Sequence, residues 1–159
     1  RVKIRLASKL NYVNLHEYNI IFIGCFKNMG IMHNVMADSP IKYSLDPKQV
    51  LLTNANGDTT DVLGITYGIP EHTEWKDYSV ASKIPGPNKN TILIISIFNS
   101  WDSGSTARQL TDMDALNSIK SEFLSPTQPF PNYFDIVFEV TGYLRTGLEA
   151  EPKYLFNRE

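Results

Sequence analysis

Two uninterrupted apolar runs dominate the hydrophobic pattern of the chain. The run Thr91–Phe98 is almost free of polar residues, and Asn19–Gly24 is a second run of the same kind. A strand with one exposed face alternates between apolar and polar residues, so an unbroken run predicts a strand that is buried on both faces. We expect the two runs to form adjacent or nearly adjacent parallel strands in the middle of one sheet, because a loop and a helical pattern follow each of them.

Helical periodicity appears after both runs. The loop Asn99–Thr106 leads into a helix that we expect from Ala107 onward, because its apolar residues recur every three or four positions, at Leu110, Met113, Leu116, Ile119 and Phe123. The segment Cys25–Gly30 leads into a shorter helix over Ile31–Met36. A strand, a loop and a helix in succession form the repeating unit of α/β sheets, in which ligands bind at the carboxyl ends of the strands.

The rest of the chain predicts more polar strands and turns. Alternation over Val2–Ala7 predicts a strand with one exposed face or an edge strand, and Asn14 is the expected N-cap of a helical turn that ends at Tyr18. The segment 85–90 predicts a hairpin that leads into the run Thr91–Phe98. Further strands are expected at Ile41–Leu45, Gln49–Thr53, Thr60–Thr66, Asp77–Ile84, Tyr133–Thr141 and Leu148–Phe156, the last of them an edge strand because of Pro152.

These elements predict a single α/β domain over residues 1–159. The expected architecture is three-layer-like: a mixed sheet with a parallel, Rossmann-like central part, an antiparallel hairpin extension, and helices that cover part of it. The sequence opens at Arg1 without Met and enters directly into a strand pattern. We therefore expect the domain to be a fragment of a longer protein, and we expect a cytoplasmic location because no signal peptide is found in this segment.

Composition narrows the classes of function. The hydrophobic content of 42% and the charged content of 20% are ordinary for a globular domain. The net charge is −2 and no basic stripe is present, which argues against direct nucleic-acid binding by this domain. No apolar run approaches the roughly 18 residues of a membrane span. The single cysteine excludes an intramolecular disulfide, and no motif indicates a particular cofactor.

Three stretches of the chain resemble a domain found at the C-terminal end of uncharacterised bacterial proteins, often with a helix-turn-helix or tetratricopeptide region upstream. The stretches are Ile4–Asn28, Asp77–Asp112 and Phe134–Gly142. The positions that match the pattern are Ile23, Gly24, Asp77, Tyr78, Gly104, Thr106 and Ala107, whereas Ile97-Phe98 stands where the pattern has a glycine. The resemblance implies a Rossmann-like ligand-binding or sensor module and brings no catalytic residues with it.

The loops after the two buried strands carry the candidate site. Carboxyl ends of parallel strands meet at one edge of a sheet, where helix N-termini present unpaired N–H groups. Lys27 would supply positive charge there, Trp101 a stacking face, and Asp102 a hydrogen-bond acceptor. The predicted site consists of Gly24, Lys27, Asn28, Asn99, Trp101, Asp102 and Ser105. The expected function is non-catalytic. The domain is expected to bind a small polar ligand and to act as a sensor for the other domains of the same chain.

Two other classes of function remain open. A Rossmann-like enzyme acting on a nucleotide or nucleoside would use Cys25 or Asp102, although a lone cysteine is more often a small buried apolar side chain. A protein-interaction module would use the edge strand Leu148–Phe156. The acidic residues in the middle of the chain, with His72, match no metal-binding spacing and are expected to be exposed loop charges; they are Asp58, Asp61, Glu71, Glu74 and Asp77.

Overall fold

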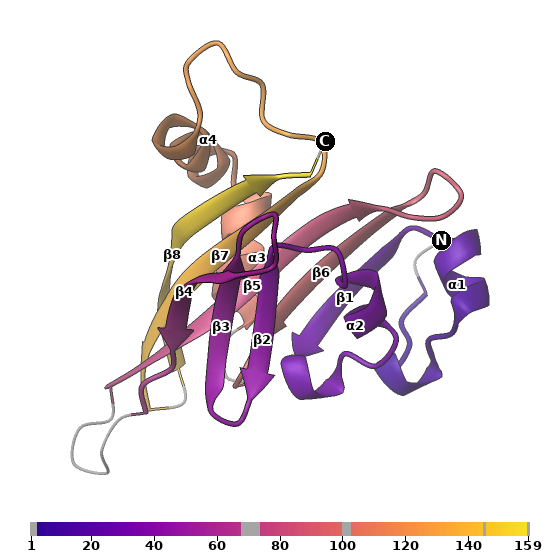
Figure 1. Cartoon of the computed structure of the whole chain (residues 1–159), viewed down its shortest axis with the longest axis horizontal. Coiled ribbons are helices and arrows are strands. Elements are labelled where there is room, and N and C mark those ends of the chain that lie inside the picture. The colour runs from indigo at the N-terminus through magenta and orange to yellow at the C-terminus, as the bar shows by residue number, and fades with distance from the viewer. Residues whose placement is uncertain (1–2, 68–73, 100–102, 145, 159) are drawn as a thin grey trace.

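A five-stranded sheet in the order β1-β6-β5-β7-β8 forms the centre of the structure, and a three-stranded antiparallel sheet, β2-β3-β4, lies in front of it in Figure 1. The computed structural model describes residues 3–67, 74–99, 103–144 and 146–158. The strands are β1 (Ile20–Cys25), β2 (Ile41–Leu45), β3 (Lys48–Thr53), β4 (Thr59–Gly64), β5 (Glu74–Pro85), β6 (Thr91–Ile97), β7 (Phe134–Tyr143) and β8 (Thr146–Asn157). The helices are η1 (Ala7–Lys9), α1 (Tyr12–Glu17), η2 (Phe26–Asn28), α2 (Met32–Val35), α3 (Ser103–Thr111) and α4 (Met113–Phe123).

The pairing of β1 with β6 is parallel, with Ile20 opposite Ile92 and Cys25 opposite Ile97. The predicted adjacency of the two apolar runs is therefore confirmed. The predicted hairpin is confirmed as well, because β5 pairs antiparallel with β6 across the turn at 86–90. The remaining neighbours in this sheet, β5 with β7 and β7 with β8, are also antiparallel.

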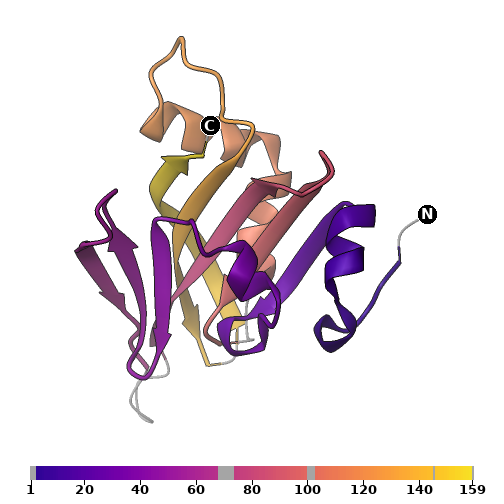
Figure 2. The same ribbon diagram turned by 45° about the vertical axis from the view of Figure 1, so that its right-hand side comes forward.

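Each face of the five-stranded sheet has its own apolar core. On one face, side chains such as Phe22, Val80 and Ile94 pack against the three-stranded sheet, α1 and α2. On the other face, Ile136 and Phe138 join a cluster that includes Ile119 of α4 and has residues of α3 packed against it. Figure 2 shows the three-stranded sheet and α3 on opposite sides of the central sheet.

The expected α/β architecture, a three-layer-like mixed sheet with a parallel Rossmann-like centre and an antiparallel hairpin extension, is wrong. Of the described residues, 45% lie in strands and 25% in helices, and the strands form two separate sheets. The β1–β6 pair is the one parallel pair in the described part of the chain. Strands β2, β3 and β4 pair only among themselves and form a layer of their own instead of extending the main sheet, which Thr66 meets in an isolated bridge with Lys76 of β5.

The expected central position of the first apolar run is also wrong, because β1 is an edge strand. Phe22 packs into one core, whereas Ile21 is 69% exposed and Ile23 is 54% exposed on the opposite face. An unbroken apolar run shows that a strand avoids polar residues, but it does not show which elements cover its two faces. The helices α3 and α4 pack over the neighbouring strands and leave this face of β1 open.

Several helices and strands begin or end at other residues than the sequence pattern predicts. No strand forms at residues 3–7, where η1 begins at Ala7, and Val2 lies outside the described residues. The N-cap of α1 is Asn11, not Asn14, and their side chains bond each other's backbone N–H groups in a capping box. The single helix expected from Ala107 is two helices, because the Asp112 carboxylate accepts hydrogen bonds at the start of α4.

The strand predictions for the second half of the chain are confirmed. Strand β7 places a row of alternate side chains in one core: Phe134, Ile136, Phe138 and Val140. Strand β8 is the other edge of the sheet, and Pro152 lies beside a register shift. Glu149, Glu151 and Lys153 also line this strand, and such charges and prolines disfavour pairing of an edge strand with another chain.

The hydroxyls of Ser79 on β5 and Thr106 on α3 form a hydrogen bond that joins the helix to the sheet, and both residues are fully buried. Replacing Ser79 with alanine should lower the free energy of unfolding by about 1–3 kcal/mol, because the Thr106 hydroxyl would be left buried without this partner. Chemical denaturation measures this loss. The double variant Ser79→Ala/Thr106→Val removes both polar groups and should recover most of it; a double variant as unstable as the sum of two single losses would contradict the explanation.

Candidate functional site

Five strand ends meet at one edge of the main sheet, which we call the carboxyl edge because the parallel strands β1 and β6 both end there. Strand β7 also ends at this edge, and β5 and β8 begin there. It lies at the bottom of Figure 1. This is the edge at which the sequence analysis expects a ligand.

An open cleft of about 570 Å³ lies at the carboxyl edge, where β5 and β8 begin and β7 ends. Small-molecule sites in proteins typically measure roughly 300–1,000 Å³ and combine apolar walls with a few polar groups. The residues that line this cleft show that combination: Thr66, Glu74, Trp75, Lys76, Thr141, Gly142, Tyr143 and Leu148. We call it the Trp75 cleft.

Trp75 lines the cleft, but its indole lies on the face of the sheet opposite Glu74 and Tyr143, because successive residues of a strand alternate between the two faces. Its side chain is 6% exposed, and its Nε1–H donates a 2.8 Å hydrogen bond to the Leu144 carbonyl oxygen. The ring lies against Gly142, since a Cβ atom at that position would come within 2.1 Å of the Trp75 Cζ2 atom. A glycine is therefore required at position 142 for the indole to occupy its place.

Exposed side chains form the rest of the cleft. Tyr143 is 49% exposed and Leu148 is 68% exposed, so both offer apolar surface to a ligand. Glu74 lies directly opposite Tyr143 in the β5–β7 pairing. The Lys76 ammonium lies 3.4 Å from a carboxylate oxygen of Glu139, which balances its charge within the protein.

A fully buried carboxylate, Asp77, lies two residues along β5 from Trp75 on the same face of the sheet. One of its oxygens accepts hydrogen bonds of 2.9 Å from the backbone N–H and from the side-chain amide of Asn99, and the other accepts a 2.7 Å bond from the Tyr78 N–H. Burial raises the pKa of Asp77 to about 6, and the hydrogen bonds from Asn99 and Tyr78 oppose that shift. Asp77 thereby ties the segment after β6 to the start of β5.

The sequence analysis placed Asp77 among exposed loop charges, which is wrong. The alternation of residue types over 77–84 predicts a strand, and it indicates that Asp77 belongs to that strand and not to an exposed loop. Asp77 is in phase with Ser79 and Ala81, small residues that suit a face covered closely by a helix.

The predicted site residues lie on both faces of the sheet. Asn99 turns toward Asp77, and Ser105 is buried in α3, which packs on that same face. Trp101 and Asp102 lie outside the described residues. The structure thus brings Asn99 and the helix that carries Ser105 to one face.

The first predicted loop approaches the opposite face. Gly24 pairs with Ser96 within the sheet, and the η2 turn that carries Lys27 and Asn28 presents both side chains to solvent. The neighbouring Phe26 ring packs 4.6 Å from the ring of Phe98 and 4.6 Å from that of Tyr43 in β2. Lys27 and Asn28 therefore lie beside the second sheet, away from Asp77 and Asn99.

None of the residues that line the Trp75 cleft was among the predicted site residues, and Trp75, Tyr143 and Leu148 illustrate why. They are distant in the chain and belong to no motif. Only the register of β5, β7 and β8 brings them together. The pairing of a tryptophan on one strand with a glycine on the next was the available signal, and it becomes informative only when the register is known.

The candidate nucleophile Cys25 is buried at the end of β1. His33 is engaged elsewhere, since its Nδ1 lies 2.9 Å from the Tyr43 hydroxyl. Within the described residues, no group of three or more His, Cys, Asp or Glu side chains is arranged to hold a metal ion. Nor does any helix in the described ranges have the length and apolar character needed to cross a membrane.

Comparison of the chain with protein-family models, with curated proteins and with solved structures finds no match.

Replacing Gly142 with alanine should lower the free energy of unfolding by about 1–3 kcal/mol, as overpacking of a closed site does. The added Cβ would lie 2.1 Å from Trp75 Cζ2 and 2.5 Å from the Thr146 carbonyl oxygen, so both the indole and the backbone must move. Chemical denaturation followed by tryptophan fluorescence measures the loss. The matched control is Gly64→Ala in β4, where no atom lies within 4 Å of the added methyl group. Equal stability of the two variants would contradict the described position of Trp75.

Proposed function

We propose that this domain binds a small ligand in the Trp75 cleft and catalyses no reaction on it. The observation that carries the proposal is the cleft itself: an open volume of about 570 Å³ at the edge of the sheet where the parallel strands end. Ligands in sheets that contain parallel strands commonly bind at this edge. Of the predicted site residues, Asn99 reaches the start of β5 through its hydrogen bonds to Asp77.

The composition of the cleft supports a ligand with one apolar part and one polar part. Tyr143 and Leu148 offer apolar surface for the first. Glu74 and the hydroxyls of Thr66 and Thr141 offer hydrogen-bonding groups for the second. The sequence predicts a polar ligand, and we propose that this ligand is amphipathic.

The surroundings of the cleft support a role in sensing. Trp75 and Asp77 belong to the same strand. The Asp77 carboxylate accepts hydrogen bonds from Asn99, the residue that follows Phe98. A ligand that shifts the start of β5 would therefore act on Asn99, just after β6. We propose that this movement communicates binding to other domains of the same chain.

A ligand screen with site-resolved detection tests the proposal. Small amines, alcohols, acids, sugars and nucleotides are added to the protein, and a rise in melting temperature reports binding to the folded state. Two-dimensional NMR then shows where each hit binds. We expect the largest shifts at the Trp75 indole N–H and at the amides of Gly142 and Leu148.

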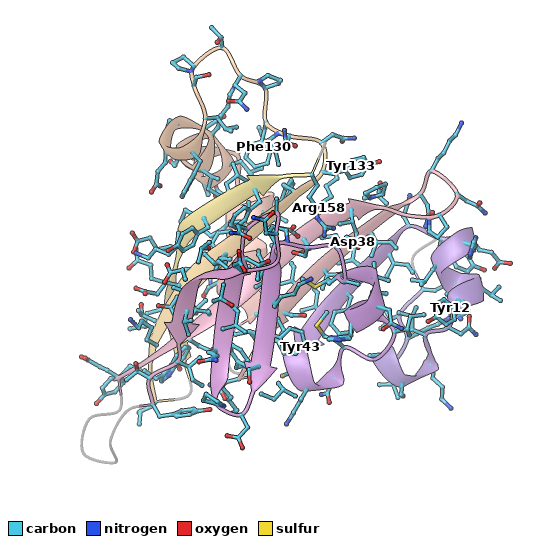
Figure 3. All side chains as sticks on the ribbon, viewed as in Figure 1. Tyr12, Asp38, Tyr43, Phe130, Tyr133 and Arg158 are labelled. Carbon is cyan, nitrogen blue, oxygen red and sulfur yellow. The ribbon has the colours of Figure 1, made fainter. Side chains whose placement is uncertain are left out.

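Tyr143→Ser is the cleft variant, and Tyr12→Ser is its matched control. Tyr12 is 61% exposed on α1, at the far side of the molecule in Figure 3. Tyr143→Ser should weaken binding at least tenfold, and Tyr12→Ser should leave it unchanged. Hits that shift only resonances away from the cleft, or a hit whose affinity survives Tyr143→Ser, would overturn the proposal.

A further inference from the structure

We infer that the segment Lys3–Leu6 is a strap that docks on the free edge of β1 as a sixth strand of the main sheet, parallel to β1. The structure shows the strap undocked, as exposed chain that precedes η1. Three features carry the inference: the unprotected edge of β1, the residue pattern and position of the strap, and the length and hand of the connection between the two.

The edge of β1 that faces away from β6 lacks the features that usually protect an edge strand. Among the residues that the structure describes, β1 pairs with β6 alone, and no backbone hydrogen bond reaches its other edge. Strand β1 contains neither a charged residue nor a proline, whereas β8 at the opposite edge of the sheet has both. Ile21 and Ile23 add exposed apolar surface to one face of this edge. Proteins commonly cover such an edge with another element.

The strap has the residue pattern of a strand with one apolar face. Ile4 and Leu6 alternate with Lys3 and Arg5, so in an extended chain the two aliphatic side chains share one face and the two charged ones the other. Ile4 is 95% exposed and Leu6 is 73% exposed, and covering such side chains is favourable. Leu6 already has an extended backbone, with φ −69° and ψ 142°. At Leu6, docking therefore requires little change of backbone conformation.

The strap lies near the edge that it would join. The Lys3 ammonium is 5.2 Å from the centroid of the Tyr18 ring, and Tyr18 precedes the first residue of β1 by two positions. Figures 1 and 2 both show the chain before η1 on the side of β1 that faces away from β6. In both views this chain runs from the N label toward η1, in the direction of β1. A lateral shift of the strap would therefore produce a parallel pair.

One register of the strap on β1 fits these positions. With Ile4 opposite Ile21 and Leu6 opposite Ile23, the four aliphatic side chains lie on the same face and cover one another, as cross-strand neighbours do. The same register keeps the Lys3 side chain beside the start of β1, where the structure already places it. The strap would thereby cover the face of β1 that α3 and α4 leave open.

The connection between the strap and β1 has the length and the hand of a parallel crossover. Residues 7–19 would join the two strands, and a parallel connection needs about a dozen residues or more. Helix α1 in this connection packs through Leu15 into the core that lies under the three-stranded sheet, in front of the main sheet in Figure 1. With α1 in front and the strap outside β1, the crossover is right-handed, as nearly all such crossovers are.

Solution NMR of the unmodified protein tests the inference. We expect nuclear Overhauser effects between the methyl groups of Ile4 and Ile21 and between those of Leu6 and Ile23. Amide hydrogen exchange should be at least tenfold slower in the strap than in an unstructured chain, because a docked strand shares its N–H groups with β1. Strap amides that exchange at the rate of an unstructured chain, without these methyl contacts, would overturn the inference.

Ile4→Asn/Leu6→Asn is the decisive variant, with Val13→Asn on α1 as the control. All three are exposed aliphatic side chains in the structure, so the substitutions leave both cores intact. The double variant should abolish the protection of the strap and speed the exchange of the β1 amides that point away from β6 at least tenfold, whereas Val13→Asn should change neither. If those β1 amides exchange equally slowly in the double variant and in the unmodified protein, the strap does not cover them and the inference is overturned.

Discussion

Replacing Arg158 with alanine should lower the free energy of unfolding by about 3–5 kcal/mol at neutral pH, the cost of removing one partner from a buried ion pair. The Arg158 Nε lies 2.8 Å from an oxygen of the Asp135 carboxylate, which is fully buried. The Ser39 hydroxyl donates a 3.0 Å hydrogen bond to the same oxygen. Without the guanidinium, that carboxylate would remain in the core without its cation.

Arg158 also fixes the end of the described chain. Its backbone N–H donates to the Tyr133 carbonyl oxygen, and Figure 3 labels both residues near the upper end of the main sheet. Urea denaturation of the Arg158→Ala variant measures the loss. Lys153→Ala is the control, because it breaks a partly exposed pair with Glu151 and should cost less than about 1 kcal/mol.

The loss in Arg158→Ala should depend on pH. Burial raises the pKa of Asp135, and the guanidinium opposes that shift. In the variant the carboxyl group takes up a proton more readily, so the loss of stability should be smaller at pH 4 than at pH 7. The double variant Asp135→Asn/Arg158→Met removes both charges and should recover most of the stability. A loss below about 1 kcal/mol in Arg158→Ala at pH 7 would show that the pair does not stabilise the fold.

Raising the pH from 4 to 7 should lower the free energy of unfolding by about 2 kcal/mol through Asp77 alone. Burial raises the pKa of this carboxyl group to about 6 from its ordinary value of 3.8. Between these two values the folded protein binds the proton and the unfolded chain does not. Stability therefore falls as the pH rises through this window, and the contribution of Asp77 is constant above it.

The variant Asp77→Asn cannot ionise and should lose this part of the pH dependence. The measurement is the difference between the stability of the wild type and of the variant at a series of pH values, because the buried Asp135 contributes a change of the same sign to both proteins. Asp58→Asn, at an exposed aspartate of the β3–β4 turn, should keep the wild-type slope. Parallel profiles for the wild type and Asp77→Asn would contradict the burial of an ionisable group at this position.

The sequence predicts individual strands more reliably than their arrangement. The alternation over β7 and the apolar runs of β1 and β6 follow from local hydrophobicity, and these strands form where they are expected. What covers each face is not a local property. Ile21 and Ile23 are as apolar as Ile94 and Ile95, yet the first pair is exposed because α3 and α4 do not reach the edge of the sheet.

The short strands of the middle segment show the same limit. Turns at Asp46-Pro47 and Asn56-Gly57 indicate hairpins, and β2, β3 and β4 form two of them. Nothing in the residues states whether the hairpins extend the main sheet or cover it. The buried residues Val50 and Leu52 belong to the same core as Phe22 and Val80. The three-stranded sheet therefore covers the main sheet, and only the structure shows this.

The sequence predicts the edge of the sheet at which the candidate site lies, but it does not predict the residues that form the site. Parallel strands β1 and β6 lead to the carboxyl edge, as their apolar runs indicate. The cleft at that edge, however, is built by antiparallel strands whose register the sequence does not state. Trp75 and Gly142 are neighbours because β5 and β7 pair over ten positions, far from any motif.

A crystal structure of the protein grown with the tightest-binding compound of the ligand screen, at a saturating concentration, tests the central claim most directly. We predict electron density for the ligand in the Trp75 cleft, against Tyr143 and Leu148. An empty Trp75 cleft in those crystals, or a ligand bound at another site, would contradict the account.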